Sequence, residues 1–243
     1  MIVLTLSRLL WPCVVVPAAA QSGGRILVGL SGGVQSGAPP LTDHFEFERN
    51  VETATVDVKY PAKSAVLVDG SLTARVWKEI GAGVAVSQGT RSGSALVDAR
   101  IPHPLLFQQP RTVAGSQSAL STAETGVHIY LAYAVRATRR LTVTPFGGPS
   151  FLHLTRELVR DVTYNESYPY DAATFSSAPT RRATAGAIGV NAGVDLRWMF
   201  ARSVGIGGLV RFTRATIDLS AGDRSLPVRA GGIQAGAGIR LVF

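Results

Sequence analysis

Apolar and polar residues alternate along most of this chain, and each alternating segment has one face that is almost wholly apolar. Segment 233–243 shows this most clearly. Its apolar face consists of Ile233, Ala235, Ala237, Ile239, Leu241 and Phe243. Alternation with a period of two is the pattern of a β-strand with two different faces, and no stripe with the 3.6-residue period of a helix runs over a comparable length. The pattern predicts an all-β protein.

Eight segments alternate in this way, namely 25–35, 64–77, 80–88, 123–136, 140–155, 183–200, 203–219 and 226–243. Tight turns are expected at 78–79, 137–139 and 201–202, whereas the other connections span 36–63, 89–122, 156–181 and 220–225. The two kinds of connection take turns along the chain, which predicts a closed antiparallel eight-stranded transmembrane β-barrel whose first and last strands pair. Segment 45–60 also alternates, and it either extends the first hairpin above the membrane or adds a pair of strands, so a ten-stranded barrel is an alternative.

The second face of each strand distinguishes a membrane barrel from a soluble one. In segment 183–200 this face carries Asn191, Asp195 and Arg197 among small residues. A surface in water would be richer in Lys and Glu, whereas small residues mixed with charges of both signs suit a narrow lumen. The apolar face is therefore expected to meet lipid, which favours a membrane barrel over a secreted soluble barrel.

Composition is consistent with a barrel that crosses a membrane with strands. The chain has 243 residues, of which 46% are hydrophobic and 16% are charged, with 26 glycines and a mean hydropathy of +0.22. No continuous apolar run approaches the roughly 20 residues of a transmembrane helix. The net charge of +8 is scattered along the chain rather than gathered in runs. Scattered charge favours contact with anionic lipid headgroups and argues against nucleic-acid binding.

The first 20 residues have the order of a secretory signal peptide. Arg8 precedes an apolar stretch at 9–16, and small residues follow at 18–20. We expect residues 1–20 to be removed after export and residues 21–243 to form one β-barrel domain. The single cysteine, Cys13, would leave with the signal peptide, so no disulfide is expected in the mature protein.

The signal peptide, the eight alternating segments and the ending AGAGIRLVF together resemble the outer-membrane β-barrel proteins of Gram-negative bacteria, of the small OmpA-like kind. Gly238, Leu241 and Phe243 are similar to the carboxyl-terminal signal that the barrel-assembly machinery recognises, although Gly236 stands where this family often has a polar residue. The resemblance implies an outer-membrane location, with the assembly machinery and outer-membrane lipids as partners, and a monomer. A peptidoglycan-binding domain after the barrel is not expected.

The lumen of an eight-stranded barrel is just wide enough to be filled by side chains. The inward-facing polar candidates are Asp69, Arg75, His128, Tyr130, Arg136, Asn191, Asp195, Arg197, Arg211, Gln234 and Arg240. The favoured interpretation is a structural polar network that closes the lumen, since buried charges need partners. The alternative is a narrow, porin-like path for solutes or ions that the arginine excess would bias toward anions.

Catalysis is not expected. His44 and His103 lie in predicted loops and His128 and His153 in predicted strands, but none forms a recognisable arrangement with a serine and an acid. We also expect no metal site and no cofactor. A lipid-modifying outer-membrane enzyme is the less favoured alternative.

The long connections hold the remaining candidates for function. Leu105, Leu106 and Phe107 lie between prolines, which suggests either packing over the barrel mouth or contact with a partner. Segment 164–171 is rich in tyrosine and suits an adaptable recognition surface or a turn. The sequence therefore predicts a structural or surface-interaction protein whose mobile outer loops contact an extracellular ligand.

Overall fold

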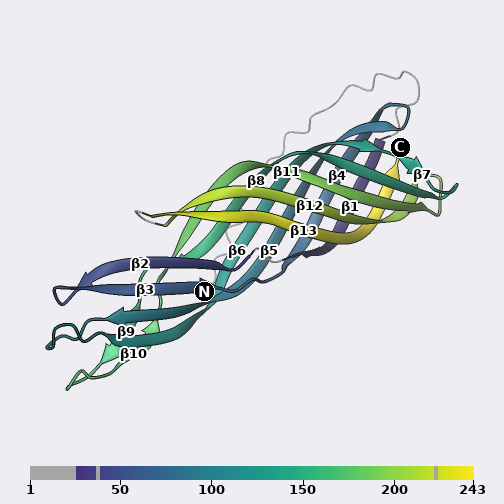
Figure 1. The fold of residues 1–243 in the computed structure, drawn as a ribbon. Coiled ribbons are helices and arrows are strands. Elements are labelled where there is room, and N and C mark those ends of the chain that lie inside the picture. Colours follow the sequence, from purple (N-terminus) through teal and green to yellow (C-terminus); the bar gives the residue numbers. More distant parts are fainter. Residues whose placement is uncertain (1–25, 37–38, 222–223) are drawn as a thin grey trace, which may run out of the picture.

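A computed structural model describes residues 26–36, 39–221 and 224–243, and these residues form β-strands joined by turns (Figure 1). The strands are β1 (Ile26–Gln35), β2 (Leu41–Arg49), β3 (Glu52–Tyr60), β4 (Ala65–Trp77), β5 (Ile80–Ile101), β6 (Arg111–Tyr133), β7 (Val135–Arg136), β8 (Leu141–Val159), β9 (Thr163–Glu166), β10 (Ala173–Ser177), β11 (Thr180–Met199), β12 (Val204–Ala221) and β13 (Arg224–Val242). In the described part of the chain, no helix is long and apolar enough to span a bilayer. The predicted signal peptide lies outside the described residues.

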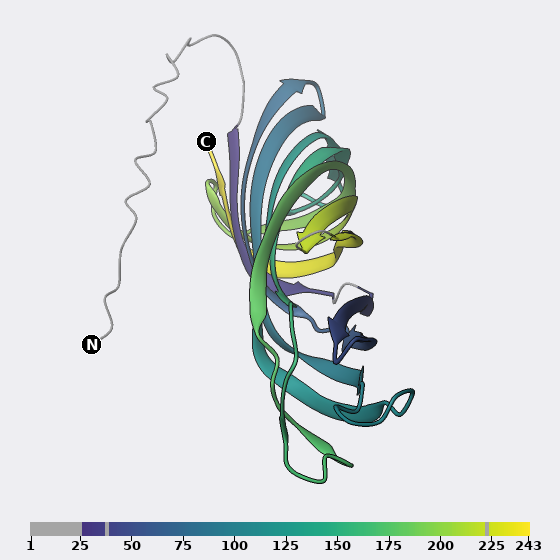
Figure 2. The same cartoon turned by 90° about the vertical axis from the view of Figure 1, so that its left-hand side faces the viewer.

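Eight of the strands form an antiparallel ring in the order β5, β4, β1, β13, β12, β11, β8 and β6, and β6 pairs with β5 to join the two ends of the path. The first and last strands of the ring, purple and yellow in Figure 2, pair from Leu27 with Val242 to Gln35 with Gln234. Ile26 and Phe243 exchange two backbone hydrogen bonds of 2.9 and 3.0 Å. The prediction of eight strands and of this seam is confirmed. The alternative of a ten-stranded ring is wrong, because β2 and β3 lie outside the ring.

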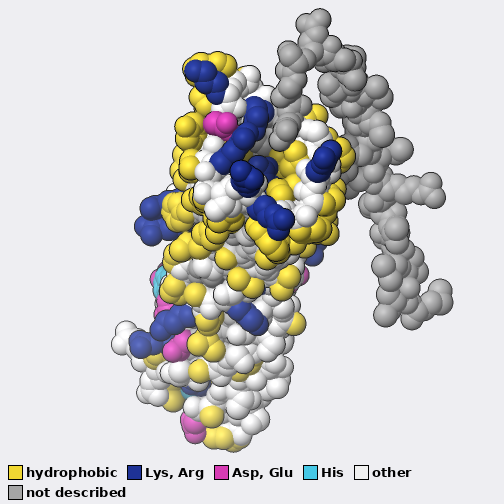
Figure 3. All heavy atoms as spheres, turned by 90° about the vertical axis from the view of Figure 1, so that its right-hand side faces the viewer, with side chains coloured by type: hydrophobic (Ala, Val, Ile, Leu, Met, Phe, Trp, Pro, Cys, Tyr) yellow, Lys and Arg dark blue, Asp and Glu magenta, His cyan; other side chains and the backbone are white. Residues whose placement is uncertain are grey.

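The turns between β4 and β5, before β8, and between β11 and β12 gather at one end of the barrel, which we call the short-turn end (Figure 1). The half of the barrel next to it carries an outward-facing band of exposed apolar side chains, which we call the membrane half (Figure 3). On β11 the band runs from Ile188 to Trp198. The ten residue-to-residue steps between these two ends cover about 33 Å of strand and, at a tilt near 40°, roughly 25 Å of height, which matches a bilayer core.

Aromatic side chains border this band at the short-turn end. Trp77, Tyr133, Trp198, Phe200 and Phe243 are all exposed there, by 45–70% of their surface. Such girdles mark the level of the lipid headgroups, where amphipathic rings are favoured.

The ring continues well past the apolar band as a distal half. The same positions keep pointing inward along each strand, but the polarity of the two faces reverses: the inward face becomes apolar and the outward face becomes polar. On β12, Val210 and Phe212 point outward in the band, while Arg211 and Thr213 point inward. Further along the same strand the inward residues become Ala215, Ile217 and Leu219, and the outward ones become Arg214, Thr216 and Asp218. The distal half thus has an apolar core and a polar surface, as expected in water, and its outside is mostly uncoloured in Figure 3.

Strands occupy most of the connections that were predicted to be mobile loops. Residues 89–122 belong largely to β5 and β6, which extend to Ile101 and from Arg111 and pair throughout. The β2–β3 hairpin occupies residues 41–60 and pairs with β5 through Thr55–Lys59, and β9 and β10 form a separate hairpin within 156–181. The prediction of long irregular loops is wrong here, because these segments alternate with their apolar residues on the inward face.

Candidate functional site

Two ion pairs cross the lumen of the membrane half. Arg211 of β12 donates to Asp69 of β4 over 2.6 Å and to Gln234 of β13 over 3.2 Å, and both charged side chains are at least 98% buried. Arg240 of β13 donates to Asp195 of β11 over 2.5 and 3.0 Å. All five residues were predicted to face the lumen. Pairing is what makes their burial possible, because an unpaired charge in this interior would be costly.

A neutral hydrogen-bonded layer lies beside these pairs. The two ring nitrogens of His128 are 2.9 Å from Ser87 Oγ and 2.7 Å from Ser150 Oγ, and Asn191 donates to Ser150 over 2.8 Å. His128 has no exposed surface. A solute therefore has no access to this imidazole in the observed state, even though it lies between two serine hydroxyls.

Tyr130 lies in the same lumen, one step nearer the short-turn end. Its hydroxyl is 2.9 Å from Thr73 Oγ1, and its ring packs against Phe146 with the centroids 5.1 Å apart. The contact with Phe146 brings an aromatic layer next to the ionic one.

A further hydrogen-bonded pair, Gln35 and Glu124, lies on the distal side of Arg211 and was not predicted from the sequence. Gln35 donates to Glu124 over 2.8 Å, and Gln234 donates to Gln35 over 3.2 Å. Glu124 also accepts a hydrogen bond from the backbone of Gly231, whose φ of +93° belongs to the region that glycine adopts freely. Gln35 and Glu124 have the inward parity of their strands, so a stricter extension of the alternation to the strand ends would have found them.

Three predicted lumen arginines lie near the short-turn mouth instead. Arg75 and Arg197 are partly exposed and line a cavity there. Arg136 was predicted to belong to the polar network inside the lumen, but its side chain is 60% exposed at the mouth. It lies on the short strand β7, and its guanidinium is 3.7 Å from Glu79 at the neighbouring turn. The ladder of this segment with β5 ends at Tyr133, and Arg136 continues only in the short pairing of β7 with β8, where it lies opposite Thr142.

The lumen ends distally in the apolar core of the distal half. Leu152, Leu154, Ile217 and Leu219 have at most 1% of their surface exposed. Tyr60 of β3 closes this core from the side, accepting a hydrogen bond from the backbone of Val159 over 2.8 Å. Burial raises the pKa of Tyr60 to about 12. The side chains on both sides of the ion pairs are almost fully buried, so side chains fill the lumen at this level.

Three hairpin ends meet at the far end of the distal half, which we call the distal tip (Figure 1). Asn50 at the β2–β3 turn donates to the carbonyl of Pro102 in the β5–β6 connection over 3.3 Å. Arg111, at the start of β6, donates to the carbonyl of Tyr170 over 3.0 Å and pairs with Glu166 of β9 over 2.7 Å. These contacts join the three turns to one another.

Large apolar side chains are exposed at the distal tip. They are Val51 (82%), Leu105 (65%), Leu106 (45%), Phe107 (75%) and Tyr168 (81%). The backbone amides of Leu105 and Leu106 both donate to the ring of buried His103 over 3.1 Å, so this connection is ordered by a side chain beneath it. Val51, Gln108 and Tyr170 have φ of +65°, +57° and +75°. Non-glycine residues in this strained region of backbone conformation cluster at functional sites.

The other histidines do not assemble a catalytic group. His153 points outward and is exposed on β8, and exposed His44 contacts Asp57 at 2.9 Å on the β2–β3 hairpin. Hydrogen bonds to Asp57 and Glu46 raise the pKa of His44. Within the described ranges, no group of three or more His, Cys, Asp or Glu residues is placed to hold a metal ion.

The residues of the predicted assembly signal lie at the β1–β13 seam. Gly238 lies opposite Ser31, and a side chain at this position would overlap the carbonyl of Leu30. Phe243 points outward and is 70% exposed. Nothing in this geometry tests recognition by the assembly machinery, which stays a prediction.

No protein-family model and no curated protein matches the sequence. Solved structures of similar fold include Ail, the attachment invasion locus protein of Yersinia pestis (11% identity, 90% of this chain and 99% of that chain, TM-score 0.40). Neisserial surface protein A (10%, 91% and 100%, TM-score 0.42) and the outer membrane protease OmpT of Escherichia coli (10%, 90% and 97%, TM-score 0.47) are also similar. These neighbours are outer-membrane β-barrels. At such scores they carry no argument about activity, and the assignment of this fold rests on the strand ring and the apolar band.

Proposed function

We propose that this chain is an outer-membrane barrel that holds an interaction surface, the distal tip, away from the bilayer and binds another protein through it. The exposed apolar side chains of the tip carry the proposal. Val51, Leu106, Phe107 and Tyr168 come from three hairpins that contact one another, and exposed apolar groups rimmed by polar ones mark interaction sites.

The rest of the molecule supports a role as a scaffold. Its lumen is filled with paired charges and apolar side chains, which makes conduction of solutes the less favoured role. His128 is enclosed and His153 lacks an acid or serine partner among the described contacts, so nothing favours an enzyme. The distal half is a packed core rather than a set of loops, which positions the tip with little loss of conformational entropy on binding.

The test places a photo-crosslinking benzophenone amino acid at Phe107, where the exposed side chain tolerates replacement. Cells that display the protein are mixed with serum and secreted proteins and irradiated. We expect discrete adducts from position 107 and none from position 229, where Arg229 is exposed on the distal half but away from the tip. Equal labelling at both positions, or labelling of lipid alone, would overturn the proposal. Steady single-channel conductance of the purified protein in planar bilayers would favour the channel instead.

A further inference from the structure

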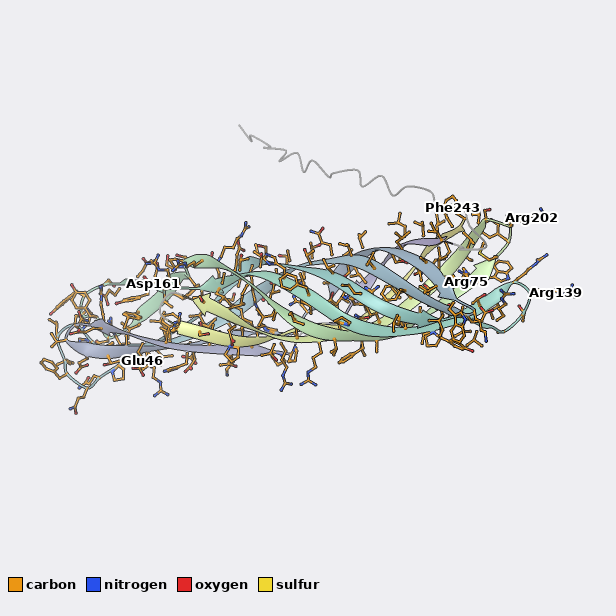
Figure 4. All side chains as sticks on the ribbon, turned by 90° about the horizontal axis from the view of Figure 1, so that it is seen from above. Glu46, Arg75, Arg139, Asp161, Arg202 and Phe243 are labelled. Carbon is orange, nitrogen blue, oxygen red and sulfur yellow. The ribbon has the colours of Figure 1, made fainter. Side chains whose placement is uncertain are left out.

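A cavity of about 190 Å³ opens at the short-turn end of the barrel, opposite the distal tip. Its walls come from β1, β4, β5, β6, β7, β8, β11 and β13 and from the turns at this end. Because a single water needs at least about 10–15 Å³, this volume has room for several waters or for a small anion. We call it the vestibule; Arg75, Arg139 and Arg202 are among its lining residues, and Figure 4 shows all three at this end of the barrel.

The vestibule is strongly cationic. Its described lining contains six arginines, Arg75, Arg136, Arg139, Arg140, Arg197 and Arg202, and one acidic residue, Glu79. Six positive charges against one negative charge leave an excess of five. Dark blue side chains gather on this end of the molecule in Figure 3. Low-dielectric walls around a cluster of one sign focus its field on an incoming anion.

The arginines have few partners within the protein. Glu79 is 3.8 Å from Arg75 and 3.7 Å from Arg136, so one carboxylate is shared between two guanidiniums at long distance. Within the described chain, Arg197 has no carboxylate within 4 Å, and its Nε is buried with no hydrogen-bond partner. The nearby carboxylate of Asp195 is already bound by Arg240. A buried donor without an acceptor is costly, and an oxyanion would satisfy it.

The vestibule has a closed inner end. Tyr130, Phe146 and the Asp195–Arg240 pair line a smaller cavity of about 30 Å³ beyond it, and the fully buried His128 layer follows. A solute that enters from the short-turn side therefore leaves by the same side. This geometry suits binding rather than passage.

We propose that the vestibule binds a phosphoryl group. Guanidinium groups present forked donors that match phosphoryl oxygens, and several of them around one enclosed space suit a multiply charged oxyanion better than a single carboxylate. The group is carried either by a small free anion in the solution on the short-turn side or by the headgroup of an anionic lipid at that membrane level. This site is independent of the distal tip and of the proposed function.

The test titrates inorganic pyrophosphate into the full protein, purified in an uncharged maltoside detergent, by isothermal calorimetry. We expect saturable binding that weakens about tenfold or more when Arg197→Gln removes a forked donor. Arg214→Gln is the matched control, because Arg214 is exposed on the outer face of β12 and its loss changes the net charge equally. Arg75→Gln provides a second variant on another strand, and heat-modifiable migration on gels shows that each variant is folded.

Absence of saturable heat, or equal weakening by Arg197→Gln and Arg214→Gln, would overturn the site. Lipid discs distinguish the two sources. If pyrophosphate binds in phosphatidylcholine discs but not in discs that contain phosphatidylglycerol, the headgroup competes for the vestibule and is its ligand. Binding that persists in both discs identifies the free anion.

Discussion

Arg211 and Asp69 meet inside the barrel from strands that lie three places apart in the eight-stranded ring, with 2.6 Å between Nη1 and Oδ2. Both side chains are almost completely buried. The pair therefore ties β12 to β4 across the lumen, where no backbone hydrogen bond can do so.

Breaking this pair should be costly. Asp69→Asn removes the counter-charge of buried Arg211, and losing one partner of a buried pair costs about 3–5 kcal/mol in free energy of unfolding. Urea unfolding in lipid vesicles, followed by the fluorescence of Trp77 and Trp198, measures this free energy. Asp218→Asn is the control, since Asp218 is exposed on the distal half, and a change within about 0.5 kcal/mol is expected there. Similar losses in both variants would show that the pair is not important for stability.

The apolar band predicts that the loss of stability caused by an outward-facing arginine on β11 depends strongly on its depth in the bilayer. Val194 lies near the middle of the band and points outward, whereas Thr184 points outward on the distal half of the same strand. Val194→Arg should lower the free energy of unfolding in vesicles by about 2–4 kcal/mol, and Thr184→Arg by less than about 1 kcal/mol. Equal effects would contradict a bilayer at this level.

Arg224 holds the β2–β3 hairpin on the distal half. Its guanidinium donates to Asp43 over 2.8 Å and lies 4.4 Å from the ring centre of Phe45. Arg224→Ala removes a charge-assisted hydrogen bond and leaves the carboxyl of Asp43 buried without this partner, so protease cleavage within residues 41–60 should accelerate about tenfold. Arg229→Ala should not accelerate it. If the barrel itself loses heat-modifiable migration, the effect is not local to the hairpin.

The hairpin should also respond to pH through His44. Hydrogen bonds to Asp57 and then to Glu46 raise the pKa of His44 above its usual 6.5 in the folded protein. A raised pKa means that the charged imidazole stabilises the fold below about pH 6.5 and that this contribution is lost as pH rises through the raised pKa. Because His44 is exposed, the effect is small and screened by salt.

Hydrogen exchange of the β2–β3 amides, corrected for intrinsic rates, should therefore show more protection at pH 5.5 than at pH 8. The difference should vanish in His44→Gln and at high salt. A pH dependence that is unchanged in His44→Gln would assign it to another group, such as Asp43, whose pKa is raised by burial against the opposing effect of Arg224.

The membrane half was largely predictable because a bilayer imposes one simple rule on every strand. Within the membrane half, the outward apolar residues of β4, β12 and β13 each keep one parity, and this parity identified the inward positions of Asp69, Arg211 and Arg240. It could not give their pairing, which depends on how far each strand is staggered around the ring.

The distal half was less predictable for a physical reason. Along β8 the outward Phe151 is followed by inward Leu152, Leu154 and Leu158, so apolar residues stand on both parities and the alternation seems to end. The strand in fact continues, but its surroundings change from lipid to water. Because of the same change, the sequence pattern did not predict the distal parts of β5 and β6, residues 89–101 and 111–122.

The reversal of polarity between the membrane half and the distal half also sets how deeply the barrel sits in the bilayer. A displacement of two residues toward the short-turn side would draw Arg214 of β12 into the edge of the hydrocarbon, at a cost of up to about 1 kcal/mol that rises toward about 2–4 kcal/mol as the arginine approaches the middle. A displacement the other way would bring Ile188 and Phe212 into water. The barrel is thus fixed vertically by its own strands, and the height at which it carries the distal tip above the lipid is constant.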